Sequence, residues 1–282
     1  MPNYRPEPPI PNFRNNGGMS LEPSTAETIR IVLVAGLLAL IGTLEPSFPR
    51  RLSDPQRPLR WMGNFALVGI GTALTLAASL SATAAALWAE RAELGLFNKY
   101  AWPAAVEFAI AWLFLDLALY AQHRAFHEIR WLWPWHRVHH SDVEFDVTTG
   151  LRFHPGEVLL VQAWKIATVL ALGAPWLAVL VYDVALSSFF VFAHANLRLP
   201  SALDRVLRLL VITPEFHRVH HSVHRDEHDR NYGNLLSIWD RLFRSYQADP
   251  RDGHRDMRIG LPGFRLPAQQ RVMALLGQPF EP

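Results

Sequence analysis

The chain contains no cysteine, and only two of its 282 residues are lysine, Lys99 and Lys165. Without cysteine, disulfide bonds, thiolate zinc sites and cysteine nucleophiles are excluded. A metal ion could therefore be held only by imidazole, carboxylate or water. The cationic charge is carried almost entirely by arginines that are scattered along the chain and form no basic stripe. We therefore expect no nucleic-acid partner.

Half of the residues are hydrophobic, and many of them fall into successive long segments. A bilayer-spanning helix needs about 20 mostly apolar residues. Two segments reach this length, the first is shorter, and the last is long enough for two spans separated by a Gly-Ala-Pro turn at 173–175. Several successive spans favour a membrane protein over the alternative, a soluble helical protein with buried core helices. The segments are residues 29–44, 61–88, 102–121 and 156–196.

Arginines are concentrated in the loop after the first apolar segment, which holds Arg50, Arg51, Arg57 and Arg60. Loops rich in Lys and Arg remain on the cytoplasmic side of a membrane. Counting the spans forward from a cytoplasmic loop at 45–60 brings every histidine-rich segment back to that same side. We therefore predict an integral membrane protein with its histidine cluster on the cytoplasmic side.

Histidines are concentrated in two short stretches. Residues 123–142 contain five of them, and the string His-Arg-Val-His-His at 136–140 recurs at 217–221. Histidines spaced three or four residues apart share one face of a helix, so each group can direct several imidazoles at one point. One zinc ion takes only four ligands, so eight histidines indicate two metal ions. The predicted ligands are His123, His127, His136, His139, His140, His217, His220 and His221.

The ligand type leaves Zn, Cu, Fe and Ni open. The HExxH signature of metalloproteases is absent, because His127-Glu128 is followed by Ile129, Arg130 and Trp131. The Glu-x-x-His ligand set of soluble di-iron bundles is also missing. An all-histidine dinuclear site beside apolar helices favours oxygen chemistry on a lipid-like substrate. An unactivated C–H bond has no acidic proton and no leaving group, so its oxidation requires a redox metal with O₂.

Four motifs in order resemble those of the fatty acid hydroxylase/sterol desaturase superfamily of membrane di-iron oxygenases. They are HRAFH at 123–127, HRVHH at 136–140, HRVHH at 217–221 and NYGNLLSIWDRLFRSY at 231–246. The resemblance extends over roughly residues 100–250. It implies an all-α integral membrane protein in which four to five transmembrane or membrane-embedded helices are capped by a cytoplasmic helical histidine-rich domain.

The same resemblance implies two iron ions as cofactors, with zinc able to replace iron in a purified protein. It also implies O₂, a lipid substrate, surrounding membrane lipids and an external electron-transfer protein as partners. The family's ligands correspond to the eight histidines above, and His194 in FAHANLRLP matches a further family histidine. The family's paired position near His194 is occupied here by Phe190, so the number of ligands differs from that of some members.

Four other residues are candidates for an extra ligand or for a group that orients a ligand: His154, Asp116, Asp183 and His224. Asp116 precedes His123 by two helical turns, and Asp183 precedes His194 by three. Either carboxylate could accept the second ring N–H of a ligand histidine, and a polar helix–helix contact is the equal alternative. His224 and His228 lie among charged residues and are expected at the surface or beside the ligands. His254 is expected to be a surface or hydrogen-bonded residue.

The predicted function is hydroxylation or desaturation of a lipid-like substrate with O₂. The alternative is a non-catalytic metal-binding or metal-transport membrane protein, which is disfavoured because transporters place ionisable groups near the bilayer midplane. Within the second histidine region, residues 201–210 predict an interfacial amphipathic helix, with core packing as the alternative. The predicted organisation is a mobile tail (1–28), membrane helices (29–121), a first histidine-box region (122–155), a transmembrane hairpin (156–196), a second histidine-box region (197–250) and a C-terminal tail (251–282).

Overall fold

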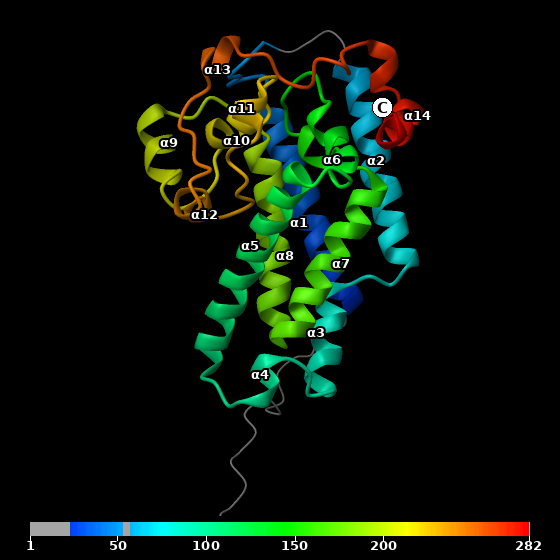
Figure 1. Ribbon diagram of the computed structural model, residues 1–282, viewed down its shortest axis with the longest axis vertical. Coiled ribbons are helices and arrows are strands. Elements are labelled where there is room, and N and C mark those ends of the chain that lie inside the picture. Colours follow the sequence, from blue (N-terminus) through cyan, green and yellow to red (C-terminus); the bar gives the residue numbers. More distant parts are fainter. Residues whose placement is uncertain (1–22, 53–56, 282) are drawn as a thin grey trace, which may run out of the picture.

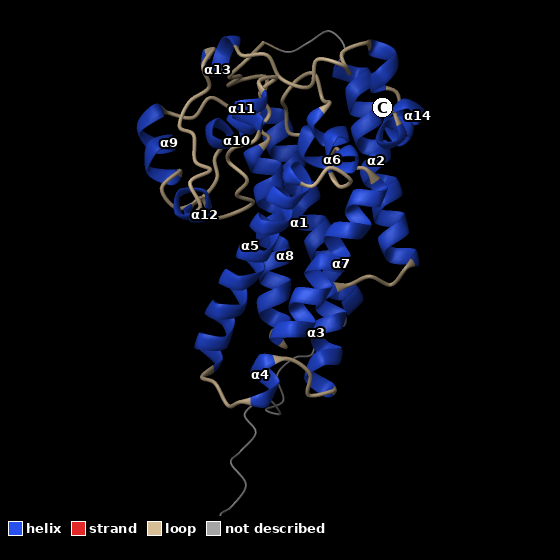
Figure 2. Cartoon of the chain, in the orientation of Figure 1, coloured by secondary structure: helices blue, strands red, loops and turns tan. Residues whose placement is uncertain are grey.

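The computed structural model describes residues 23–52 and 57–281, and within them the chain is helical, with only isolated β-bridges. Long helices form an elongated bundle, and short helices form a cap at one end (Figure 1). Figure 2 shows the same division into helices and connecting loops. The long helices are α1 (Pro23–Leu44), α2 (Arg57–Ala77), α3 (Ala82–Arg91), α5 (Ala104–Glu128), α7 (Pro155–Leu172) and α8 (Trp176–Ala193).

The short elements lie mostly in the cap, above the ends of the long helices (Figure 1). They are α4 (Leu96–Lys99), α6 (Trp133–His140), η2 (Thr149–Leu151), α9 (Ser201–Leu207), α10 (Pro214–His220), α11 (Arg225–His228), α12 (Ile238–Leu242), α13 (Gly253–Asp256), η3 (Pro267–Gln270), α14 (Val272–Gly277) and η4 (Gln278–Phe280). Only α4 lies at the opposite end of the bundle. The all-helical class predicted from the sequence is confirmed.

The bundle has the length and composition of a membrane domain. Four helical stretches in the described residues are long and apolar enough to cross a bilayer, and the apolar part of α1, Thr28–Leu44, is shorter. Their outer surfaces expose large apolar side chains such as Phe114, Trp164 and Leu177, as expected of helices that face lipid. The four stretches are Arg57–Lys99, Ala104–Glu128, Pro155–Leu172 and Trp176–Ala193.

The stretch predicted as one span at 61–88 consists of two helices in the structure. The helix α2 ends at Ala77 and α3 begins at Ala82. Ser79 takes a positive φ of 52° between them, and the Ser81 hydroxyl accepts a hydrogen bond from the Ala84 N–H, which caps α3. Since neither glycine nor proline lies at this break, the sequence pattern did not reveal it.

The hairpin of α7 and α8 turns at the predicted Gly-Ala-Pro site. Gly173 ends α7 with a left-handed φ of 63°, a conformation that is easily adopted only by glycine. Pro175 then precedes α8. The hairpin packs against α3 and α5 around a core in which small residues, among them Ala111 and Ala178, allow the helices to approach closely.

The arginine-rich loop lies at the same end of the bundle as the cap. Arg50 forms a 2.7 Å ion pair with Glu215 in α10. At the start of α2, the buried guanidinium of Arg60 bonds Asp142 and Asp146 in the loop that follows α6. Arginines that suggested the orientation in a membrane therefore also connect the bundle to the cap.

Two predicted segments differ in the structure from their expected form. Most of the predicted tail 1–28 lies outside the described residues, but α1 already begins at Pro23. The predicted C-terminal tail is instead folded, because α13, η3, α14 and η4 pack on the cap and on α2 (Figure 1). The predicted amphipathic helix corresponds to α9, which exposes Leu203 and Val206.

Candidate metal centre

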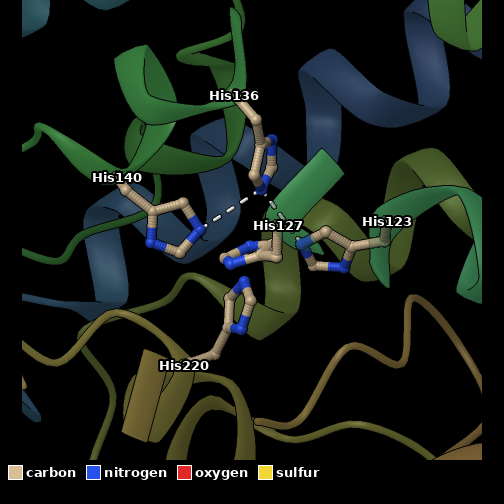
Figure 3. Close-up of side chains that lie close together, drawn as sticks. All are labelled: His123, His127, His136, His140 and His220. Atoms are coloured by element: carbon tan, nitrogen blue, oxygen red, sulfur yellow. Dashed lines mark hydrogen bonds between the residues drawn. The ribbon is translucent and has the colours of Figure 1, made fainter. Parts of the chain in front are cut away.

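All nine predicted ligand histidines lie in two compact groups at the junction of bundle and cap. The first cluster combines side chains from α5, α6 and α10, whose rings point toward a common centre in Figure 3. In each cluster one nitrogen of every ring lies within 4.8 Å of those of the other rings. The first cluster is His123, His127, His136, His140 and His220, and the second cluster is His139, His194, His217 and His221.

Each HRVHH motif contributes to both clusters. In α6, His136 and His140 are four residues apart and face the first cluster, whereas His139 faces the second. In the other motif, at α10, the arrangement is inverted, because His220 alone belongs to the first cluster. The clusters adjoin one another, and the rings of His140 and His221 are stacked with centroids 4.7 Å apart. The repeat in the sequence thus builds a paired site.

Hydrogen bonds to main-chain carbonyls determine which nitrogen of several rings carries the proton. A carbonyl oxygen can only accept, so the ring nitrogen that faces it must be protonated. Nδ1 of His123 lies 2.7 Å from the Tyr232 carbonyl, and Nδ1 of His194 lies 2.7 Å from that of Phe190. Nδ1 of His139 and His220 face the carbonyls of Arg152 and Arg230 in the same way. In these rings Nε2 has a bare lone pair.

These bare nitrogens face one another within the clusters. Nε2 of His194 lies 3.2 Å from Nε2 of His139, and each ring already carries its proton on Nδ1. Two lone pairs at this distance repel each other unless a cation lies between them. Imidazoles bound at about 2.0–2.1 Å to one ion would hold neighbouring nitrogens about 2.8–3.0 Å apart if the ion is octahedral and about 3.3–3.4 Å apart if it is tetrahedral. The donor set and its spacing therefore fit a transition-metal ion in each cluster.

Four further pairs of ring nitrogens have separations in the same range. Nε2 of His136 is 3.1 Å from that of His123 and 3.2 Å from that of His140 (dashed lines in Figure 3). In the second cluster, Nε2 of His217 is 3.0 Å from that of His194 and 3.3 Å from that of His221. Buried nitrogens without a hydrogen-bond partner among the described residues include Nε2 of His127 and Nε2 of His220.

Burial keeps the cap histidines in the neutral form that binds a metal. The pKa of His136 is lowered to about 3 by burial alone. Burial also lowers the pKa of His194 to about 4, although its bond to the Phe190 carbonyl opposes the shift. Burial and then the neighbouring imidazoles lower the pKa well below its ordinary value in the other cap members of the two clusters. Deprotonated imidazoles are required for metal binding.

Two carboxylates that the sequence analysis did not select as orienting groups contact the first cluster. Oε1 of Glu157, in the first turn of α7, lies 2.5 Å from Nδ1 of His136. Oδ1 of Asp229 lies 3.2 Å from Nδ1 of His127. Both carboxylates accept the second ring N–H and thereby orient the ring, the arrangement that commonly supports metal-binding histidines.

The carboxylates that were selected have other partners. Asp116 accepts hydrogen bonds from the hydroxyl of Tyr182 at 3.0 Å and from the indole of Trp239 at 2.7 Å. Asp183 forms a 2.7 Å ion pair with Lys165 across the hairpin of α7 and α8. Neither is hydrogen-bonded to a cluster histidine in the described structure. The expectation that these carboxylates accept the second ring N–H of a ligand histidine is therefore corrected for both residues. They form polar contacts between helices instead, which was the alternative.

His154 and His224 lie outside both clusters. His154 caps α7, where its Nδ1 accepts the Gly156 N–H at 3.0 Å and its Nε2 faces the Leu276 carbonyl. Partly exposed His224 pairs with Asp252 at 2.7 Å. These positions correct the suggestion that either residue is an extra ligand. His254, expected at the surface or in a hydrogen bond, is buried, and its Nδ1 lies 2.9 Å from Oε2 of Glu215, in agreement with the second alternative.

His228 is buried beside the first cluster. Its ring is stacked on Trp133 with centroids 5.5 Å apart, and Trp133 in turn contacts His127. His228 forms a third group of potential ligands with His127 and Asp229. These residues line a cavity of about 650 Å³ that lies next to the first cluster and extends to Arg130 and Phe264.

The surroundings of the two clusters differ. Phenylalanines border the second cluster, where Phe153 is stacked on His139 at 4.5 Å and Phe145 on His194 at 5.5 Å. The first cluster has five histidines and two carboxylate partners and also contacts the rings of Phe126 and Trp133, whereas the second has four histidines.

Fold and site together define an all-helical membrane protein with nine imidazoles gathered at one end of its helix bundle. The fatty acid hydroxylase family model matches residues 108–245, which include the nine clustered histidines. This match and the similar proteins below support the fatty acid hydroxylase superfamily, which the motifs had indicated.

Several characterised proteins are similar to this chain. Ornithine lipid hydroxylase OlsE of Rhizobium tropici is 33% identical over 180 residues, which is 64% of this chain and 52% of that protein. Human alkylglycerol monooxygenase is 31% identical over 156 residues, 55% of this chain and 33% of the relative. Fatty acid hydroxylase vlmA of Lecanicillium is 27% identical over 196 residues, 62% and 52% of the two chains. The matched regions thus span about half or less of these relatives, and no solved structure matches the chain.

Proposed function

We propose that this protein is a membrane-bound lipid hydroxylase with one iron ion in each histidine cluster. The observation that carries the proposal is that bare Nε2 atoms face one another in both clusters, those of His123 and His136 at 3.1 Å in the first and those of His139 and His194 at 3.2 Å in the second. Three similar proteins are named as hydroxylases or monooxygenases of lipids, which favours hydroxylation over desaturation. Zinc could occupy the same imidazole sites in a purified protein.

Iron bound here would supply the redox chemistry that inserts one atom of O₂ into an alkyl C–H bond while the other atom leaves as water. The balance requires two electrons and two protons per alcohol, and we propose that an external electron-transfer protein delivers the electrons. The chain itself contributes neutral imidazoles and their orientation. Glu157 and Asp229 hold His136 and His127 so that Nε2 of each faces the first cluster.

We propose that the substrate is a lipid that enters from the bilayer and that the clusters lie on the cytoplasmic side. The clusters stand at the ends of α5 and α8, at the same end of the bundle as Arg50 and Arg60. Apolar rings beside the second cluster, Phe153 and Phe145, would border an alkyl chain and exclude water. Exposed Leu203 and Val206 on α9 support contact of the cap with the membrane surface.

The test is a comparison of lipid extracts from cells that make the protein, cells that make a His220→Ala variant and cells that make neither. The cells are grown in ¹⁶O₂ or ¹⁸O₂. We expect lipids heavier by about 16 mass units, or about 18 with the heavy isotope, only with the intact protein. Lipids lighter by about 2 mass units would show that the reaction is desaturation and not hydroxylation. Identical extracts, combined with altered metal uptake, would overturn the enzymatic proposal.

A further inference from the structure

Residues 257–281, called here the C-terminal strap, lie beyond the segment matched by the family model. They cross the cap and reach both HRVHH motifs. At its N-terminal end the strap forms main-chain hydrogen bonds with the residues that follow α10. The Gly260 N–H donates to the His221 carbonyl at 3.1 Å, and the Val223 N–H donates to the Arg258 carbonyl at 2.9 Å. Met257 and Ile259 pack on Phe145, whose ring contacts His221.

The far end of the strap is fixed to α6. The side-chain amide of Gln278 donates to the Arg137 carbonyl at 3.4 Å, and its oxygen lies 3.1 Å from the Ser141 hydroxyl. The Arg137 guanidinium in turn donates to the Gln278 carbonyl. Leu275 is fully buried against Val138, the middle residue of the HRVHH motif. The strap therefore contacts Arg137, Val138 and Ser141, which are not ligands, and the imidazoles of α6 remain free to face the clusters.

The middle of the strap contacts the loop after α6. Gln270 accepts a 2.9 Å hydrogen bond from buried Arg152, and its amide donates to the Ser141 carbonyl at 3.3 Å. Arg152 also donates to the Val138 carbonyl at 2.9 Å. Gly260 passes so close to Asp142 that a Cβ atom there would lie 2.5 Å from the Asp142 carbonyl oxygen. Glycine at this position, with φ of 92°, permits the close approach.

The separation of α6 and α10 determines whether either cluster can form, because both clusters take ligands from both helices. These helices have only 8 and 7 residues, and helices of this length are not stable without tertiary contacts. We propose that the C-terminal strap sets the position of α6 relative to α10 and thereby the metal affinity of both clusters. Gln278 and Gly260 are its principal positioning residues, and the inference rests on the proposed metal centre.

The experiment compares Gln278→Ala with Gln269→Ala in the full-length protein. Gln269 is also in the strap, but among the described residues its side chain bonds only to Gly263 and Leu266, both within the strap. Metal-free protein is titrated with Co²⁺, and affinity, stoichiometry and the absorption spectrum of the bound ion are recorded together with the melting temperature. We expect about 10-fold weaker binding and an altered spectrum in Gln278→Ala, and wild-type behaviour in Gln269→Ala.

Two further variants separate ligand positioning from general stability. Gln278→Glu keeps the oxygen that faces Ser141 and should recover part of the affinity, whereas Gly260→Ala should displace the strap from Asp142 and weaken both sites. Wild-type affinity and spectrum in both Gln278→Ala and Gly260→Ala would overturn the role of the strap and leave the hydroxylase proposal intact. A wild-type protein that binds no metal would contradict both proposals.

Discussion

Oε1 of Glu157 lies 2.5 Å from Nδ1 of His136, and both side chains are buried. The carboxylate belongs to the first turn of α7, and the imidazole belongs to α6. This hydrogen bond joins a membrane helix to the first cluster and fixes Nε2 of His136 as the nitrogen that faces the other rings. The same nitrogen lies near those of both His123 and His140, so the orientation of His136 affects the whole first cluster.

Replacement of Glu157 by alanine should weaken metal binding at the first cluster by about 10–100-fold, because the orienting partner of His136 is lost. Glu157→Gln keeps an acceptor oxygen and should lose less. Cobalt titration of the purified variants measures the effect. Glu128→Ala is the control, since Glu128 is exposed at the end of α5 and pairs with Arg124. Equal affinity in Glu157→Ala and Glu128→Ala would contradict the orienting role.

Asp116→Asn should lower stability without lowering metal content. Asp116 accepts hydrogen bonds from Tyr182 and Trp239, and bonds to a charged group contribute about 1.5–3 kcal/mol. The melting temperature should fall in Asp116→Asn, fall less in Trp239→Phe, and change non-additively in the double variant. Metal analysis of the same samples should give the wild-type stoichiometry. Loss of metal at an unchanged melting temperature would restore Asp116 as a group that supports the ligands.

Arg60→Met should destabilise the protein by about 3–5 kcal/mol, because it leaves the buried Asp142 carboxylate without its main cationic partner. Burial alone would raise the pKa of Asp142, but the charges of Arg60 and Arg152 hold it below its usual range. The Arg60→Met/Asp142→Asn double variant should recover part of the loss. Chemical denaturation in detergent measures the differences. The matched control is Arg57→Met, because Arg57 is partly exposed.

Glu45 should make stability depend on pH. Burial and then the nearby Asp146 charge raise its pKa from 4.5 to about 7. Because the folded protein holds this proton more tightly than the unfolded chain does, the free energy of unfolding falls as pH rises from 4.5 to about 7. The upper limit is about 3 kcal/mol. Relative to wild type, Glu45→Gln should gain stability between pH 5 and pH 8. A difference in the free energy of unfolding between the two proteins that stays constant over this range would refute the raised pKa of Glu45.

The repeated HRVHH motif and the HRAFH motif were sufficient to predict eight of the nine histidines that gather, and His194 was expected only from the resemblance to the family. Helical spacing showed that each motif could present its rings together. It did not show that His139 would separate from His136 and His140, because that division depends on where α10 and His194 lie. Tertiary placement, which no local periodicity contains, therefore decided how ligands were shared between the two clusters.

Other features were missed for identifiable physical reasons. An acidic residue in the first turn of a helix usually complements the helix dipole, so Glu157 was not distinguished from an ordinary capping residue. The break between α2 and α3 has no glycine or proline, and serines provide the turn and the cap. The C-terminal strap acts through glutamines that bond main-chain groups more than 100 residues away. Such contacts have no periodic signature.

The metal content of the purified protein tests the central claim most directly. After anaerobic loading with Fe²⁺ and removal of excess metal, elemental analysis should find two iron ions per chain. A His194→Ala/His217→Ala variant, which loses two rings of the second cluster, should retain one. Absence of bound iron in the wild-type chain, or two ions retained by the double variant, would contradict a paired centre built from the nine imidazoles.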